Sequence, residues 1–212
     1  MIYTEKTCRE FTQATASRQP VPGGGSVSAL TGALGAALGN MVGALTVGKK
    51  KYADAEEYLN ALMKESEELQ EELLDLVQKD VDIFKSLSEL YKIKAETEEE
   101  KLRKAERMED VLEKACDIPI MVMKKCGRAI ELSKGFAEKG SSAVLSDAGA
   151  SAAICKAALQ AASLNVYINT NSMKDRIKAD RLNTLCGEYM EKYTFLADEV
   201  FGYVTDKLRG KI

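Results

Sequence analysis

Apolar residues recur at spacings of three and four along most of the chain, which predicts amphipathic helices. The clearest case is a segment from about Ala53 to Tyr91, which has an apolar stripe and an acidic side. The stripe consists of Leu62, Leu69, Leu73, Leu76, Phe84, Leu87 and Tyr91, and the acidic side carries Glu65, Glu67, Glu68, Glu71 and Glu72. We interpret the acidic side as a solvated face. No segment alternates apolar and polar residues for long enough to predict a strand.

Long proline-free stretches rich in Ala, Leu, Glu, Lys and Met extend this prediction to six helices. The predicted helices run from about Thr4 to Ala16, Ser26 to Val47, Ala53 to Tyr91, Thr97 to Lys134, Ser142 to Asn169 and Met173 to Leu208. Ser26 is the expected N-cap of the second helix, and Thr97 with Glu100 forms an expected capping box for the fourth.

Three residues are expected to interrupt or end the fourth helix. Pro119 should kink or break it, because proline lacks the backbone donor and crowds the preceding turn. Gly135 and Gly140 are the expected C-terminal stops.

Two of the six helices lack a charged face. The window 19–48 contains no charged residue, and the window 140–173 contains only two. A helix that is apolar all round is either buried or spans a membrane, and the first window is long enough to span. Its large apolar residues are sparse, however, so we favour the buried alternative.

Glycine spacing in the second helix supports close packing between helices. Gly35, Gly39 and Gly43 are four residues apart, which lets helix backbones approach each other. We therefore predict an all-α fold: a single-domain helical bundle over residues 1–212, in which two central Gly/Ala-rich helices are surrounded by long amphipathic ones. Such packing often continues across a subunit interface, so we also expect an oligomer.

Composition excludes several classes of function. The chain has 212 residues, a net charge of -3 and a pI near 5.3, which disfavours nucleic-acid binding. It has no histidine, which excludes imidazole metal ligands, a Ser-His-Asp triad and a histidine general base. It also has no tryptophan. Any proton transfer must therefore use Asp, Glu, Lys, Tyr, Cys or water.

The cysteines indicate reduced thiols rather than a metal site or disulfides. The five cysteines are Cys8, Cys116, Cys126, Cys155 and Cys186, and no C-x-x-C pair occurs. The first residues contain no basic segment followed by an apolar one, so we predict no signal peptide. We expect a cytoplasmic protein that holds no metal.

Asp80 is the most informative charged residue. It lies four residues from both Leu76 and Phe84, which places it on the apolar stripe, whereas Asp82 falls toward solvent. A carboxylate on a buried face is costly unless it is paired, and burial raises its pKa toward neutrality. Two interpretations stay open, a structural ion pair with Lys or Arg, or a general acid or base.

The fifth predicted helix carries a second carboxylate and two amides. Asp147 lies in its first turn after Ser146, where it can satisfy free amides and the helix dipole. Asn165 lies eighteen residues later on the same face, and Asn169 lies one turn further on. The amides either bind a ligand or link helices. Five turns span about 27 Å, so only a long ligand or a second subunit could connect Asp147 with Asn165.

A glycine loop and a lysine cluster flank the uncharged second helix. The loop consists of Pro22, Gly23, Gly24, Gly25 and Ser26. It is either a plain turn or a place where backbone N–H groups meet an anionic ligand, and it is not a P-loop. At the other end Lys49, Lys50 and Lys51 either complement the helix dipole or hold a polyanion.

Three stretches together resemble the cyclodeaminase/cyclohydrolase family of folate enzymes. They are PGGGSVSALTGALGAALGNMVGALTVGKKKY (22–52), LVQKDVDIF (76–84) and SDAGASAAICKAALQAASLNVYIN (146–169), and Pro119 within DIPIMVM also fits the family pattern. The resemblance implies an all-helical homodimer with sites near the subunit interface. It also implies a tetrahydrofolate substrate with a glutamate tail, and no metal or cofactor.

The resemblance also implies roles for the residues singled out above. Asp80 would be the acid/base and Asp147 a pterin anchor or second carboxylate. The glycine loop with Ser26, together with Asn165 and Asn169, would orient the pterin. Ser146 would also bind the substrate, and Lys49 and Lys50 would take the anionic tail. Proton transfer by a carboxylate suits a chain without histidine.

Two enzymes fit this resemblance. Because the domain stands alone in this sequence, methenyltetrahydrofolate cyclohydrolase is the leading prediction. Formiminotetrahydrofolate cyclodeaminase is the alternative, since both reactions use the same bridging carbon. A non-catalytic helical scaffold is a weaker alternative, because it leaves the aspartate on an apolar stripe and the glycine loop unexplained.

Overall fold

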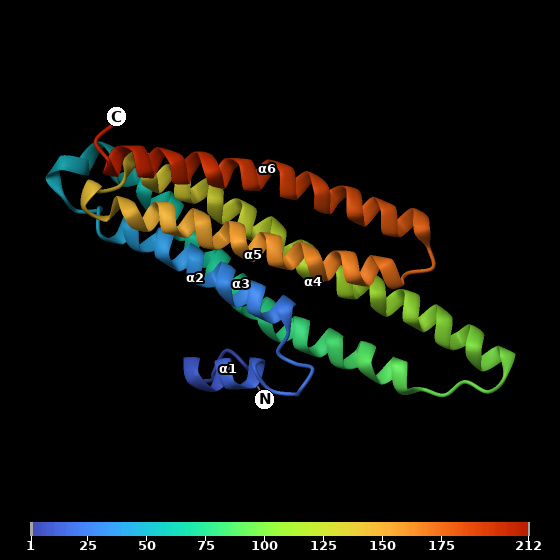
Figure 1. The fold of residues 1–212 in the computed structure, drawn as a ribbon. Helices are drawn as coiled ribbons and strands as arrows, with labels where there is room; N and C mark the ends of the chain where they lie inside the picture. Colours follow the sequence, from blue (N-terminus) through green and yellow to red (C-terminus); the bar gives the residue numbers. More distant parts are fainter. Residues whose placement is uncertain (1, 212) are drawn as a thin grey trace.

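The computed structural model of the chain describes residues 2–211, so Met1 and Ile212, the ends of the predicted domain, lie outside it. Within that range it contains helices and no strands. The elements are α1 (Cys8–Thr15), α2 (Gly24–Ala44), η1 (Lys50–Ala55), α3 (Glu56–Lys92), α4 (Glu98–Lys139), η2 (Ser142–Val144), α5 (Leu145–Ser172) and α6 (Arg176–Leu208). Helices α2 to α6 run side by side, and α1 lies apart from them (Figure 1). The predicted all-α fold is confirmed.

The two Gly/Ala-rich helices, α2 and α5, pack against each other in the middle of the bundle. Helix α2 contacts α3, α4 and α5, and α5 contacts α2, α4 and α6. Glycines make this packing close, because a Cβ atom at Gly35 would stand 2.5 Å from Cys155 Sγ, and one at Gly39 would stand 2.9 Å from Ser151 Oγ. The predicted role of the glycine spacing is therefore confirmed.

One strip of α2 and α5 is not covered by other helices of the chain. On α2 the strip exposes Leu34 by 61% along with Met41, and on α5 it exposes Leu164 and Ile168, each by 67%. By length and hydropathy α2 is also the one helix among residues 2–211 that could cross a membrane, although half of its apolar window is buried inside the bundle. The central position of both helices is thus confirmed, but they are only partly surrounded.

Several predicted helix ends need correction. Ser26 does not cap α2, because the helix begins at Gly24 with Gly23 as N-cap, which puts Ser26 inside the first turn. Pro119 does not break α4, which continues through it. Gly135 is buried within α4, so only Gly140 ends that helix. The capping box of Thr97 and Glu100 is confirmed.

The first helix also starts later than predicted, at Cys8. Thr7 and Glu10 form a second capping box there, with the Thr7 N–H donating to Glu10 Oε2 at 2.9 Å. This T-x-x-E signature is the one that predicted the start of α4, so the sequence contained the signal. Helix α6 likewise begins after Asp175, whose carboxylate accepts the N–H of Lys178.

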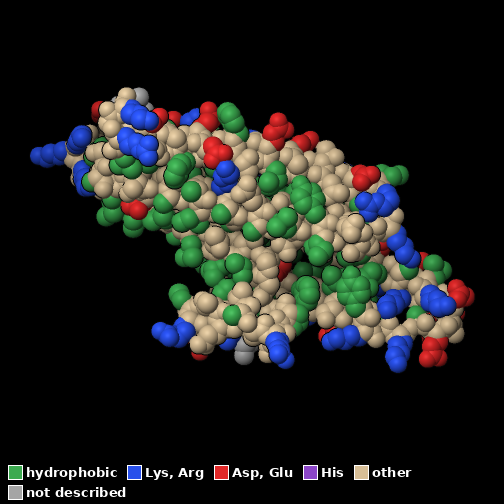
Figure 2. Space-filling view, in the orientation of Figure 1, with side chains coloured by type: hydrophobic (Ala, Val, Ile, Leu, Met, Phe, Trp, Pro, Cys, Tyr) green, Lys and Arg blue, Asp and Glu red, His purple; other side chains and the backbone are tan. Residues whose placement is uncertain are grey.

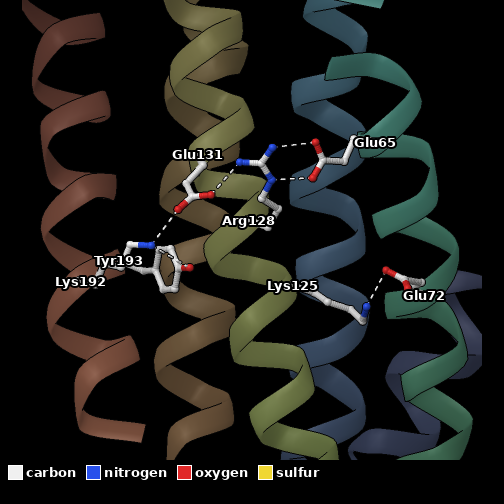
Figure 3. A network of polar contacts seen from close by, with 7 residues as sticks. All are labelled: Glu65, Glu72, Lys125, Arg128, Glu131, Lys192 and Tyr193. Atoms are coloured by element: carbon white, nitrogen blue, oxygen red, sulfur yellow. Dashed lines mark hydrogen bonds and ion pairs between the residues drawn. The ribbon is translucent and has the colours of Figure 1, made fainter. Parts of the chain in front are cut away.

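The acidic face of α3 is more than a solvated surface. Glu65 and Glu72 pair with Arg128 and Lys125 of α4, and Arg128 also pairs with Glu131 (Figure 3). Lys192 of α6 extends this network to Glu131 at 3.0 Å. The network therefore links α3, α4 and α6 along one side of the bundle.

The described cysteines are all free thiols in helices, and only Cys8 is exposed. Burial raises the pKa of Cys155 to about 12, which keeps this thiol protonated and unreactive. The interpretation of the cysteines as packed, reduced residues agrees with these positions.

Candidate active site

The start of α2 meets the middle of α3 at Asp80. The hydroxyl of Ser26 donates to Asp80 Oδ2 at 2.6 Å and lies 3.3 Å from the carbonyl oxygen of Val77. Gly25 packs directly against the carboxylate, since a Cβ atom there would overlap Asp80 Oδ1. The glycine loop thus brings the backbone onto the carboxylate, and a side chain at residue 25 would prevent that approach.

The surroundings of Asp80 distinguish between its two open interpretations. Burial raises the pKa of Asp80, and hydrogen bonds from the hydroxyl and backbone of Ser26 oppose that rise. Asp80 takes part in none of the ion pairs found among residues 2–211. An uncompensated, partly buried carboxylate is better suited to proton transfer than to structural pairing. Asp82 is exposed, as predicted.

Asn165 of α5 lies on the other side of the same glycine loop. Its amide approaches Gly24, where a Cβ atom would stand 3.4 Å from Asn165 Nδ2, and that nitrogen donates to Ala161 O at 3.1 Å. Asn169 instead links helices, because its Nδ2 donates to the carbonyl oxygen of Ala115 in α4 at 2.9 Å. Gly24, Gly25, Ser26, Asp80 and Asn165 form one cluster, which we call the Asp80 cluster.

Pro22 and Gly23 directly precede the start of α2, with Gly23 as its N-cap, whereas four other predicted site residues lie at the opposite end of this helix. Lys49 and Lys50 are exposed just after this helix, and Ser146 and Asp147 lie in the first turn of α5. Helix α2 has 21 residues and spans about 30 Å. Within one chain, therefore, these residues cannot act on the same small group as Asp80.

Tyr52 belongs to that second end and was not singled out in the sequence. Its hydroxyl accepts the N–H of Ser142 at 3.2 Å, and bonds from the Ser141 hydroxyl and from Ser142 lower the pKa of Tyr52 to about 8. We call Lys49, Lys50, Tyr52, Ser146 and Asp147 the α5-start cluster. Its signal in the sequence was the position of Tyr52 directly after three lysines.

No group of three or more His, Cys, Asp or Glu side chains suited to a metal ion occurs in the described part of the chain. The Asp80 cluster offers one carboxylate, one hydroxyl, one amide and backbone groups. That set can move a proton and orient a polar planar ligand.

Comparison with known proteins assigns the chain to a family. The family model described as Formiminotransferase-cyclodeaminase matches residues 7–188. The chain belongs to this family. The match includes every residue of the Asp80 cluster and of the α5-start cluster.

Among relatives in this family, a methenyltetrahydrofolate cyclohydrolase from Methylorubrum extorquens is 39% identical over 86% of this chain and 88% of its own length. The formimidoyltransferase-cyclodeaminase of Gallus gallus is 32% identical over 78% of this chain, but this chain covers only 30% of that longer protein. The crystal structure of formiminotetrahydrofolate cyclodeaminase from Thermotoga maritima superposes with a TM-score of 0.82 at 28% identity, over 97% of each chain.

Proposed function

We propose that this protein hydrolyses 5,10-methenyltetrahydrofolate to 10-formyltetrahydrofolate. The observation that carries this proposal is the partly buried, unpaired carboxylate of Asp80 at the glycine start of α2. The similarity to a cyclohydrolase of nearly the same length supports it further. The domain also matches only part of the longer cyclodeaminases.

The proposed chemistry needs proton transfer at one carbon. Water adds to the cationic carbon between N5 and N10, and Asp80 takes the proton that the water loses. The bond from this carbon to N5 then breaks, N5 receives a proton, and the hydroxyl proton leaves as the formyl carbonyl forms. The negative charge of Asp80 also stabilises the cationic substrate in a site of low polarity.

We assign positioning roles to the other members of the Asp80 cluster. Ser26 fixes the orientation of the Asp80 carboxylate by its 2.6 Å hydrogen bond to Oδ2. Asn165 and the backbone at Gly24 orient the pterin by hydrogen bonds. In this proposal no metal or cofactor takes part.

Cyclodeamination of 5-formiminotetrahydrofolate is the second candidate. The fold similarity to the Thermotoga maritima cyclodeaminase over nearly the whole chain favours it. In that reaction N10 attacks the formimino carbon and ammonia leaves, so the same carboxylate would move the protons.

The first experiment follows the methenyl absorbance with purified protein, using wild type and Asp80→Asn. We expect a rate well above buffer, and a loss of at least ~100-fold in kcat for the variant if Asp80 transfers protons. A near-wild-type rate in folded Asp80→Asn would remove Asp80 from the mechanism.

The same assay with 5-formiminotetrahydrofolate tests the second candidate by the appearance of the methenyl compound. Thermal unfolding with and without tetrahydrofolate tests the scaffold alternative, since a folate enzyme gains stability from its ligand. Inactivity in both assays with no thermal shift would contradict both enzyme proposals.

We further propose a cytoplasmic homodimer formed through the uncovered strip of α2 and α5. This strip is apolar, because it exposes Leu34, Met41, Leu164 and Ile168, and α2 has no charged residue. Such a surface is better suited to contact with another protein than to contact with water. A two-fold axis across antiparallel helices would set the α5-start cluster of a second copy beside the Asp80 cluster. This arrangement would give Asp147, Lys49 and Lys50 access to the substrate.

A further inference from the structure

After Asp80 the apolar stripe of α3 is only partly buried. Leu87 and Leu90 stay buried, but Phe84 is exposed by 40% and Tyr91 by 56%. The sequence predicted that Phe84 and Tyr91 face the core with the rest of the stripe, and that part of the prediction is wrong. The reason is that α2 begins at Gly24, beside Asp80, so it does not cover the last three turns of α3.

The facing side of α5 is exposed in the same way. Ile168 lies about one turn beyond Asn165 and is exposed by 67%. Helix α4 closes the space between α3 and α5 from behind, because Asn169 bonds to Ala115 and Leu87 packs in a cluster with Leu112. Past the start of α2, therefore, α4 joins the exposed sides of α3 and α5. The surface is hollowed there, where the α3–α4 end meets the main body (Figure 2), and we call this hollow the groove.

This groove ends in a basic cavity of about 330 Å³ between the α3–α4 turn and the end of α5. The lining residues include Ala95, Lys101, Lys104, Met108, Ser172 and Lys174. In Figure 2 hydrophobic side chains gather where the lobe of the α3–α4 end joins the main body, and Lys and Arg side chains surround them.

The charges in the cavity favour an anionic occupant. Glu109 also lines it, but both of its carboxylate oxygens accept backbone N–H groups, from Lys174 and Asp175, at 2.9 Å each. Lys101 pairs only with the exposed Glu98, at 2.7 Å. The ammonium group of Lys174 takes part in none of the ion pairs found among residues 2–211.

We propose that this groove is the subsite for the p-aminobenzoyl-glutamate part of the substrate, and that Lys101 and Lys174 bind the glutamate carboxylates. The proposal rests on the proposed function. It places the tail on lysines of the same copy that holds Asp80, and not on Lys49 and Lys50 of a second copy. Phe84 offers apolar surface to the benzoyl ring. Polyglutamates, with more carboxylates, bind more tightly than the monoglutamate.

The dimensions of groove and ligand agree. Seven residues of helix separate Asn165 from Ser172, a rise of about 10 Å. A benzoyl ring, an amide bond and a glutamate side chain extend roughly 10 to 12 Å from N10. A pterin held at Asp80 and Asn165 would therefore place its first glutamate at the lysines.

The test compares KM for mono- and triglutamyl 5,10-methenyltetrahydrofolate. In the double variant Lys101→Gln, Lys174→Gln we expect KM for the triglutamate to rise about tenfold, because two charge pairs with the glutamate carboxylates are lost at an exposed site. We expect kcat to stay unchanged, since the lysines lie far from the reacting carbon. Lys64→Gln, Lys124→Gln is the matched control, because both lysines are exposed and lie outside the groove.

A binding experiment separates this proposal from the proposed reaction. We expect p-aminobenzoyl-triglutamate, which has no pterin, to bind the wild-type protein in calorimetry and to bind Lys101→Gln, Lys174→Gln at least about fivefold more weakly. Unchanged binding and KM in this variant would overturn the subsite even if the enzyme is active. An effect confined to Lys49→Gln, Lys50→Gln would also overturn it. Lysine-dependent binding by an inactive protein would retain the subsite and overturn the reaction.

Discussion

At the scale of single residues, Ser26 and Asp80 form a pair in which two effects on one pKa compete. Burial raises the pKa of Asp80, and the Ser26 hydrogen bonds lower it. In Ser26→Ala the carboxylate loses a bond that favours its charged form, so its pKa should rise further. If Asp80 acts as the base, the acid limb of the profile of kcat/KM against pH should move to higher pH. Initial rates with the methenyl substrate across pH measure this shift.

Ser28→Ala is the matched control for Ser26→Ala. Ser28 is also buried in the first turns of α2, but its hydroxyl donates to Gly24 O at 2.6 Å. Its variant should keep the wild-type profile. Identical profiles for all three proteins would show that the Ser26 hydrogen bond does not tune the base.

The pKa of Asp80 also affects folding. Because this pKa is higher in the folded than in the unfolded chain, folding binds a proton in the window between the two values. The contribution to stability is present below the unfolded pKa and is lost as pH rises through the folded pKa. The site thus retains a carboxylate that opposes folding at neutral pH, as expected for a functional group.

At the scale of helices, the outcome of a glycine substitution depends on what faces the glycine. A Cβ atom added at Gly202 of α6 would meet no neighbouring atom within 4 Å, whereas a Cβ at Gly127 of α4 would overlap the Tyr193 ring. Gly202→Ala should stabilise the protein by about 0.5 to 1 kcal/mol, because alanine suits a helix interior better. Gly127→Ala should destabilise it by about 1 to 3 kcal/mol, because Tyr193 must move. Urea unfolding measures both.

Gly187→Ala provides a second comparison on α6, again with open space around the added methyl group. It should behave like Gly202→Ala. Equal destabilisation by Gly127→Ala and Gly202→Ala would contradict the close packing of α4 against α6.

At the scale of the whole molecule, the uncovered strip of α2 and α5 bears on assembly. Leu34 lies in the strip and is exposed by 61%. Leu34→Glu places one charge from each copy in a two-fold interface and should convert the proposed dimer into a monomer. Sedimentation velocity measures the change in mass.

Leu102→Glu is the matched control, since Leu102 is equally exposed, at 62%, but lies near the start of α4. It should leave the dimer intact. A wild-type chain that sediments as a monomer would contradict the dimer, and recovery of the chain with membranes would support the alternative that α2 meets lipid.

The helices, the central place of α2 and α5, and the position of Asp80 on an apolar stripe could all be predicted from the amino-acid pattern. These features depend on local periodicity, on glycine spacing and on the absence of charge over a long window. A capping box predicted the start of α4 for the same reason, because its partners are three residues apart.

Which of these residues meet depends on how the helices pack, and the pattern along the chain does not give it. Ser26 was expected to cap its own helix, but it bonds to Asp80, 54 residues away. Lys49 and Asp147 were expected to act on the same substrate as Asp80, and the length of α2 separates them from it within one chain, so a second subunit would have to bring them there. Phe84 continues the apolar stripe of α3 in sequence but is exposed. The reason is that α2, which covers this stripe, begins beside Asp80 and does not extend over the following turn of α3. Periodicity indicates which side of a helix is apolar, and only the packing of neighbouring helices decides where that side is covered.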